Sequence, residues 1–281
     1  MRANRDPKAR LRSVNRLATQ PLGPKSFGNV LDTAFSLYRR SFSTVVLAMA
    51  IANVPVLIIE VIMLQQSQTV LSGAVPSASA IANLAKNFNG LGIVADLLSL
   101  LGVAAVLVVL DLVYRGEAAT IGKAYSQAAK RYLMFLLVSI VVGVTGVVGL
   151  ILLIIPGVIL LTYFSQTMFL TVLDGAGFGA LGRSWRLVSG HFWRVLGIAV
   201  VAFLIYYVVV IFIDGLTGAI VVAAAGLSPS PTTAAAAIAV VALIVQTLIG
   251  AFPLAALYVQ HMDLRVRKEG LDLAGTGMIG S

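Results

Sequence analysis

The sequence predicts an all-α integral membrane protein with six transmembrane helices. Hydrophobic residues make up 59% of the 281 residues and charged residues 11%, whereas a soluble domain carries about 25% charged residues. Six apolar runs are long enough to cross a hydrocarbon core of about 30 Å at about 1.5 Å per residue. The spans are expected at residues 42–64, 91–114, 132–154, 157–173, 192–213 and 234–258.

The distribution of basic residues predicts the orientation of these spans. Nine of the 20 Lys and Arg residues precede the first span, four lie between spans two and three, three lie between span four and the start of span five (Arg194 included), and three follow span six. Only Lys86 falls on the opposite side. Because cytoplasmic segments of membrane proteins are enriched in Lys and Arg, both termini are expected in the cytoplasm. The expected location is the bacterial cytoplasmic (inner) membrane, and the net charge of +9 is attributed to this orientation rather than to nucleic-acid binding.

The beginning of the chain is expected to be a disordered, basic cytoplasmic tail. Residues 1–25 carry seven Lys or Arg, and no apolar run starts before Phe42. That run is longer than the roughly 7–15 apolar residues of a signal peptide, so the first span is interpreted as an uncleaved signal anchor. The predicted organisation is the tail 1–25, a six-span membrane domain 26–268 and a cytoplasmic C-terminal tail 269–281.

Three amphipathic segments precede the first, third and fifth spans. They cover residues 26–40, 115–131 and 179–194, and each has apolar residues at helical spacing on one face. We expect interfacial helices on the cytoplasmic face, the first of them capped by Ser26. Each segment ends in a basic and aromatic cluster, which indicates either an internal threefold repeat or the anchors that any helix entering a bilayer favours. The polar stretches 65–90 and 214–233 are expected to be loops.

The third and fourth spans are expected to form a hairpin. The 42 residues between Arg131 and Asp174 carry no charge. Pro156 and Gly157 interrupt the run, and this pair predicts a tight turn on the extracytoplasmic side. Small residues allow helices to approach closely, and span three carries Gly143, Gly146 and Gly149.

Three blocks resemble a bacterial membrane family, the glycerophosphoryl diester phosphodiesterase membrane domain. Residues 27–35 (FGNVLDTAF) with 38–40 (YRR) resemble its first amphipathic helix. Residues 155–159 (IPGVI) and 180–193 (ALGRSWRLVSGHFW) resemble its central block, and residues 263–273 (DLRVRKEGLDL) resemble its charged terminal signature. Together the blocks extend over nearly the whole chain.

The resemblance implies a fold and a membrane location rather than a hydrolase. The family label comes from fusions with a soluble phosphodiesterase domain, which this sequence does not contain. Two positions depart from the family pattern, since Asp174 stands where relatives often have Glu and Gly182 where a basic residue is common.

The residues themselves also argue against an enzyme. There are no cysteines, which excludes thiolate chemistry and disulfides. The glycine pattern at 177–182 follows a membrane span rather than the strand that a dinucleotide site needs, so it is interpreted as a turn. No acid is positioned to orient His191, and the cytoplasmic acids are scattered along the chain among arginines: Asp32, Glu117, Asp174, Asp263, Glu269 and Asp272. Neither a catalytic site nor a metal or cofactor is expected.

Polar residues inside the predicted spans form a candidate intramembrane site. Glu60 and Asp96 are expected at similar depths in neighbouring spans, and Gln166 and Gln246 lie in spans four and six. Buried acids in a membrane favour a functional hypothesis such as a proton or cation site. The alternatives are that the acids reach the outer interface and that the amides form interhelical hydrogen bonds.

The cytoplasmic side supplies a candidate interaction surface and the favoured function. Basic side chains near an anionic leaflet gain about 1 kcal/mol each, so anionic lipids are expected partners, and a protein partner at this face is the sharper alternative. The candidate residues are Arg183, Trp185, Arg186, His191, Trp193, Arg265 and Arg267. The sequence favours a non-enzymatic scaffold or accessory module in bacterial envelope or lipid-related processes. The second hypothesis is a transporter or permease for a small solute that uses polar groups within the bundle.

Overall fold

The computed structural model describes residues 24–71, 78–225 and 231–270, and within these ranges it is helical with no strand. Six helical segments are long and apolar enough to cross a membrane, which confirms the multi-pass, all-α prediction. The predicted disordered tail, residues 1–25, lies almost wholly outside the described residues. The six segments are Phe27–Met63, Gly90–Tyr114, Ile121–Leu152, Ile154–Asp174, Phe192–Ile220 and Val240–Glu269.

The first two helices are longer than the sequence predicts. Helix α2 runs over Phe27–Leu71 and α3 over Ala78–Tyr114. Ser26 caps α2 as expected, because its hydroxyl accepts a hydrogen bond from the Asn29 amide at 3.2 Å. The segment 26–40 is not a separate interfacial helix, and most of residues 65–90 are not a loop. Nothing between residues 40 and 42 stops the helix, and the Gln, Ser and Ala residues of the second stretch are compatible with a helix.

The hairpin consists of α4 (Ile121–Leu152) and α5 (Ile154–Phe164). The chain reverses at Leu153, which is extended, and not at Pro156-Gly157 as predicted. Pro156 lies in the first turn of α5, where its missing amide donor costs nothing. The segment 121–131 is continuous with α4, so the second predicted interfacial helix is also part of a span.

Glycine allows the two arms of the hairpin to touch. A Cβ built on Gly149 would lie 2.9 Å from the Cα of Gly157, and one built on Gly146 would lie 2.5 Å from a Leu161 methyl group. Gly143 meets no atom within 4 Å. The prediction of close packing through small residues therefore holds for two of the three glycines.

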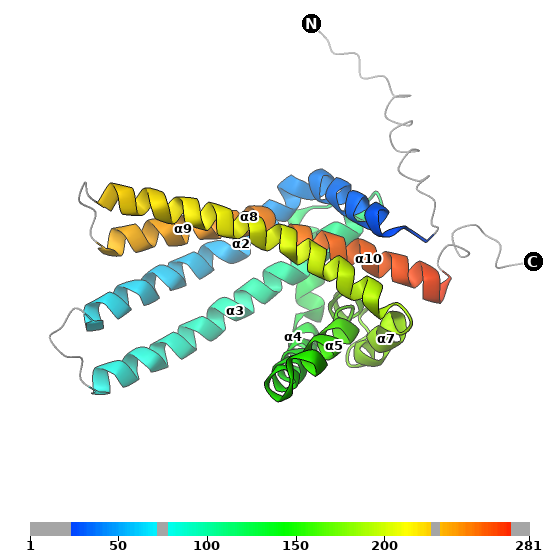
Figure 1. Ribbon diagram of the computed structural model, residues 1–281, viewed down its shortest axis with the longest axis horizontal. Helices are drawn as coiled ribbons and strands as arrows, with labels where there is room; N and C mark the ends of the chain where they lie inside the picture. The colour runs from blue at the N-terminus through cyan, green and yellow to red at the C-terminus, as the bar shows by residue number, and fades with distance from the viewer. Residues whose placement is uncertain (1–23, 72–77, 226–230, 271–281) are drawn as a thin grey trace, which may run out of the picture.

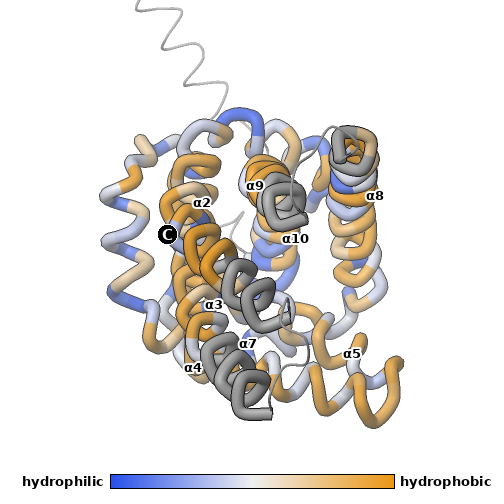
Figure 2. Tube along the Cα trace, turned by 90° about the vertical axis from the view of Figure 1, so that its left-hand side faces the viewer, coloured by the Kyte–Doolittle hydropathy of each residue, from blue (hydrophilic) through white to orange (hydrophobic). Residues whose placement is uncertain are grey.

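The hairpin lies at a steep angle to the other long helices. In Figure 1, α3, α8 and α9 run across the view, whereas α4 and α5 are seen almost end-on. Figure 2, turned by 90°, shows the hairpin extending sideways from the bundle with hydrophobic residues along most of its length. Its tip is apolar and exposed, with Ile151, Ile154 and Ile155 each at least 73% accessible.

The fourth span is not one continuous helix. After α5 the chain turns at Ser165 and Gln166, continues as α6 (Thr167–Phe169), and ends in a π-helical turn, η1 (Leu170–Asp174). Gly175 and Gly177 have positive φ angles of 71° and 53°, a backbone conformation that glycine adopts without strain. They lead into α7 (Gly179–Val188), the one predicted amphipathic segment that is a separate helix.

The last two spans are α8 (Phe192–Ala225) and the pair α9 (Pro231–Ile249) and α10 (Ala251–Glu269). Both α8 and α9 extend into residues 214–233, which were expected to be a loop. Gly250 separates α9 from α10, and a Cβ there would lie 2.5 Å from the Gln246 carbonyl oxygen. Near this point the Asn53 side chain donates to Thr247 at 2.8 Å, and the Tyr38 hydroxyl donates to the Leu248 carbonyl.

The core lies where α2, α3 and α10 meet, and Figure 1 shows α10 along the middle of the molecule. Residues 104–110 of α3 are buried on every side. On α10, Tyr258 is fully buried and packs edge-on against Phe169 of α6, with ring centroids 6.0 Å apart. The interior therefore holds the C-terminal half of α10 in place, and this half carries the polar residues described next.

Candidate functional site

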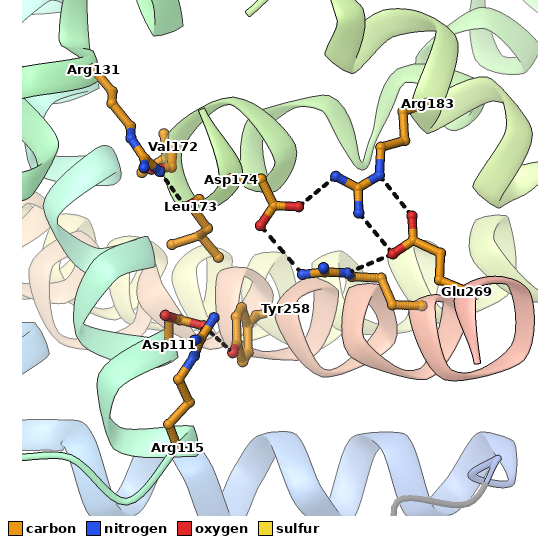
Figure 3. A network of polar contacts seen from close by, with 10 residues as sticks. Asp111, Arg115, Arg131, Val172, Leu173, Asp174, Arg183, Tyr258 and Glu269 are labelled. Carbon is orange, nitrogen blue, oxygen red and sulfur yellow. Dashed lines mark hydrogen bonds and ion pairs between the residues drawn. The ribbon is translucent and has the colours of Figure 1, made fainter. Parts of the chain in front are cut away.

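Several described arginines that the sequence assigns to one side of the membrane converge on one end of the bundle. Figure 3 shows this polar end, where the end of α3, the start of α4, η1, α7 and α10 meet. Its ion pairs and hydrogen bonds link residues that are up to 242 positions apart in the chain. Two acidic centres organise it, one around Asp174 and Glu269 and the other around Asp263.

The first centre is a closed ring of two arginines and two carboxylates. Arg183 of α7 donates to both carboxylate oxygens of Glu269 at 2.7 Å and to Asp174 at 2.6 Å. Arg265 of α10 bridges the same two acids, at 2.9 Å to Glu269 and 3.4 Å to Asp174. Bidentate arginine–carboxylate pairs are among the stronger polar contacts in proteins. The ring fixes α7 to the end of α10.

The second centre is the carboxylate of Asp263, whose side chain is completely inaccessible to solvent. It accepts hydrogen bonds from Arg194 at the start of α8 at 3.0 Å and from Arg267 at 2.9 Å. The backbone amide of Lys25 donates to it at 2.6 Å, and the Lys25 carbonyl accepts from both arginines. A buried charge needs such full pairing, so this centre ties the start of the described chain to α8 and α10.

Two further contacts connect α3 to α10 and α4 to η1. Asp111 pairs with Arg115 at 2.9 Å, as the i, i+4 spacing predicts, and also accepts from the buried Tyr258 hydroxyl at 2.8 Å. Arg131 of α4 donates to the carbonyl groups of Val172 and Leu173 in η1 (Figure 3). Arg131 thus pairs with the carbonyl groups that the π-helical turn leaves unbonded at the end of span four.

The environment of the polar end shifts the pKa of two of its basic groups. The hydrogen bonds to Glu269 raise the pKa of Arg183 above its ordinary value, and the charges of Glu269 and Asp174 raise it further. Burial lowers the pKa of His191 below its ordinary value, and the charges of Lys268 and Arg267 lower it further. Arg183 therefore stays charged at all accessible pH values, and His191 favours the neutral form.

Aromatic and basic side chains are exposed on the surface of the polar end. Trp193 is 80% accessible, and Arg186 and Phe178 are also exposed. Trp185 stacks on Tyr163 with ring centroids 4.0 Å apart, and this contact holds α7 against α5. Arg186 makes no ion pair with another described residue. The surface composed of Phe178, Trp185, Arg186 and Trp193 is called the α7–α8 corner below.

The structure separates the predicted interaction residues into two groups. Arg183, Arg265 and Arg267 face inward and are engaged in the two acidic centres. Trp185, Arg186 and Trp193 belong to the α7–α8 corner. His191 lies between them, close to Lys268 and Arg267, and its Nδ1 atom is buried without a partner among the described residues. The acids that seem scattered in sequence are also grouped, since Asp174 and Glu269 share two arginines.

The predicted intramembrane site is not assembled from its described members. Gln166 is fully buried at the break in span four, whereas Asp96 of α3 and Gln246 of α9 have exposed side chains. The side chain of Glu60 lies outside the described part of the structure. Residues that the sequence reasoning missed are Gln260 and His261, both fully buried on α10. Their only signal is their polarity just beyond the end of the last predicted span, residues 234–258.

Comparisons with known proteins identify no relative. No family model, curated protein or solved structure matches the chain. Within the described residues, no group of three or more His, Asp or Glu side chains is arranged to hold a metal ion. The function is therefore argued from the arrangement of the polar end.

Proposed function

We propose that the protein is a non-enzymatic scaffold in the bacterial inner membrane, with both termini in the cytoplasm, and that its α7–α8 corner binds anionic lipid headgroups. The observation that carries the proposal is that the ion-paired residues of the polar end are separate from its exposed residues. Asp174, Glu269 and Asp263 are each held by two arginines, while Trp193 and Arg186 point outward.

This division supports a binding surface better than a reaction centre. A general acid or base must be able to reach the group with which it exchanges a proton, whereas the oxygens of these carboxylates already accept hydrogen bonds from arginines and from the Lys25 amide. Exposed tryptophan and arginine at the end of a membrane helix are typical of contact with headgroups.

The two tryptophans provide a direct test. The chain contains only Trp185 and Trp193, and both lie at the corner. In the Trp185→Phe variant all tryptophan fluorescence comes from Trp193. In nanodiscs we expect stronger quenching by brominated phosphatidylglycerol than by the same amount of brominated phosphatidylcholine, because the anionic lipid is enriched around Arg186.

Two further variants make the lipid test specific. Arg186→Gln should reduce the preference for the anionic lipid, whereas Lys123→Gln, which removes a cation already paired with Glu117, should leave it unchanged. Equal quenching by both lipids contradicts lipid binding. A photocrosslinker at position 193 that captures a defined protein in cells, combined with equal quenching, indicates a protein partner instead.

A transporter for a small solute is the second candidate, favoured by one observation. The fourth span is broken at Ser165–Gln166, and the sixth is broken at Gly250. Discontinuous membrane helices frequently form solute or ion sites. This function predicts that Glu60→Gln and Asp96→Asn abolish uptake while the protein still accumulates. Unchanged uptake in both variants argues against it.

A further inference from the structure

The break in span four places polar side chains inside the bundle. The break begins at Ser165 and Gln166, and the segment then ends in a π-helical turn, a feature frequently found at functional sites. Gln166 is 0% and Thr167 2% accessible. Both side chains are therefore withdrawn from lipid and from solvent.

Four buried side chains at this place have polar atoms that bond to no described residue. They are the Oε1 atom of Gln166, the Oγ1 atom of Thr167, both amide atoms of Gln260 and both ring nitrogens of His261. Buried polar atoms in native proteins are almost always hydrogen-bonded. Unpaired buried atoms in this number favour a bound molecule that supplies their hydrogen bonds.

The Phe169 ring brings the two segments together. It stacks on the His261 ring with centroids 5.1 Å apart and planes inclined by 21°. Phe169 follows Gln166 by three residues, a spacing that places both on one face of a helical segment. Gln260 directly precedes His261 in α10. This stack forms the junction between the break in span four, which carries Gln166 and Thr167, and the part of α10 that carries Gln260 and His261.

The chemistry of these atoms selects the class of ligand. Gln260 offers an amide donor and an acceptor, His261 in its neutral form offers one of each, and Thr167 can act as either. Gln166 contributes an acceptor, since its amide nitrogen already donates to Ser165 at 2.9 Å. A cation would pair only with the acceptors and an anion only with the donors. The nearby charges of Arg183 and Arg265 are balanced by Asp174 and Glu269.

We propose that this junction is a binding site for small neutral molecules that both donate and accept hydrogen bonds. Water is the smallest member of the class, and a small amide or polyol is the larger alternative. The site is separate from the α7–α8 corner and does not depend on lipid binding there. A molecule bound there would supply hydrogen bonds to polar atoms inside the bundle, at the point where span four is interrupted.

The absence of cysteine allows the site to be probed by thiol modification. We compare Thr167→Cys with Leu170→Cys, because both positions are buried, three residues apart, and Leu170 lies in an apolar cluster. The probe is methyl methanethiosulfonate, a small neutral reagent, applied to the full-length protein in membranes. Since modification needs water and a thiolate, Thr167→Cys should react at least about tenfold faster than Leu170→Cys.

Equal, slow modification of the two variants would overturn the proposal, provided both react fully after denaturation. Acetamide, added as a competitor, separates the two ligands. If it slows modification of Thr167→Cys, the site takes a small amide, and if it does not, water is the ligand.

Thermal stability gives a second measurement that does not require the cysteine variant to fold. Gln260→Met keeps the size of the side chain and removes both polar atoms. If the cluster is unliganded, removing unpaired polar atoms should raise the melting temperature, and that result contradicts the proposal. If a bound molecule satisfies the amide, the melting temperature should fall.

Discussion

The backbone amide of Lys25 donates a hydrogen bond of 2.6 Å to the carboxylate of Asp263, across 238 positions of the chain. Asp263 also pairs with Arg194 and Arg267, so one buried carboxylate joins the beginning of the bundle, α8 and α10. Because two arginines and an amide depend on a single carboxylate, its loss leaves several polar groups unpaired at once.

Asp263→Ala should therefore be strongly destabilising. Breaking a buried ion pair by removing one partner costs about 3–5 kcal/mol, and the change should appear as a lower free energy of unfolding in detergent. Glu117→Gln is the control, because Glu117 pairs with Lys123 at a fully exposed position and should change nothing measurable. Similar stability of the two variants would mean that the Asp263 centre does not hold the bundle together.

The ring around Arg183 should depend on the geometry of its side chain as well as on its charge. Arg183→Lys keeps the charge but cannot make the bidentate contact to Glu269. A double-mutant cycle of Arg183→Ala with Glu269→Ala should give a coupling energy of about 0.5–3 kcal/mol. Arg183→Lys should recover only part of it. Full recovery by lysine would show that charge alone matters at this position.

The hairpin should be sensitive to a single methyl group. Gly149→Ala places a carbon 2.9 Å from the Gly157 Cα, and it must push α4 and α5 apart. Overpacking of this kind costs about 1–3 kcal/mol. Gly143→Ala is the matched control on the same helix, because its Cβ meets no atom within 4 Å. Thermal unfolding of the two variants should differ, and equal melting temperatures would contradict the close contact.

The polar end should lose stability on acidification through His191. The pKa of His191 is lowered in the folded protein by burial and by Lys268 and Arg267. Below the unfolded-state pKa of about 6.5, the unfolded chain therefore binds more protons than the folded one, and stability falls as the pH falls. His191→Asn should flatten the pH dependence of the melting temperature below about pH 6.5. An unchanged profile would place the pH response elsewhere.

The apolar pattern of the chain predicts the number of spans but not their lengths. Hydrophobicity marks where a helix lies in the bilayer, and helix propensity lets it continue beyond that point. No helix-breaking residue lies at residues 40–42 or at residues 131–132, where the amphipathic segments meet the predicted spans. Both segments therefore continue into spans. Gly175 and Gly177 do interrupt the helix, and the one separate amphipathic helix follows them.

The polar end shows which contacts can be predicted from local spacing. The i, i+4 rule identifies the pair of Asp111 and Arg115, and it would also have identified Asp263 with Arg267 and Arg265 with Glu269. The contact of Arg183 with Glu269 spans 86 positions and depends on how α7 and α10 pack. No periodicity in one sequence contains that information.

The Asp263 centre also sets an order of events during synthesis. Asp174 and Arg183 are nine positions apart and can meet as soon as α7 has emerged. Arg194 and the backbone of Lys25 must wait for Asp263, which enters the membrane region only after α8 and α9 have been made. Until then Arg194 and the segment before α2 lack the carboxylate that they share. Translation of α10 is thus the step at which the bundle becomes a closed structure.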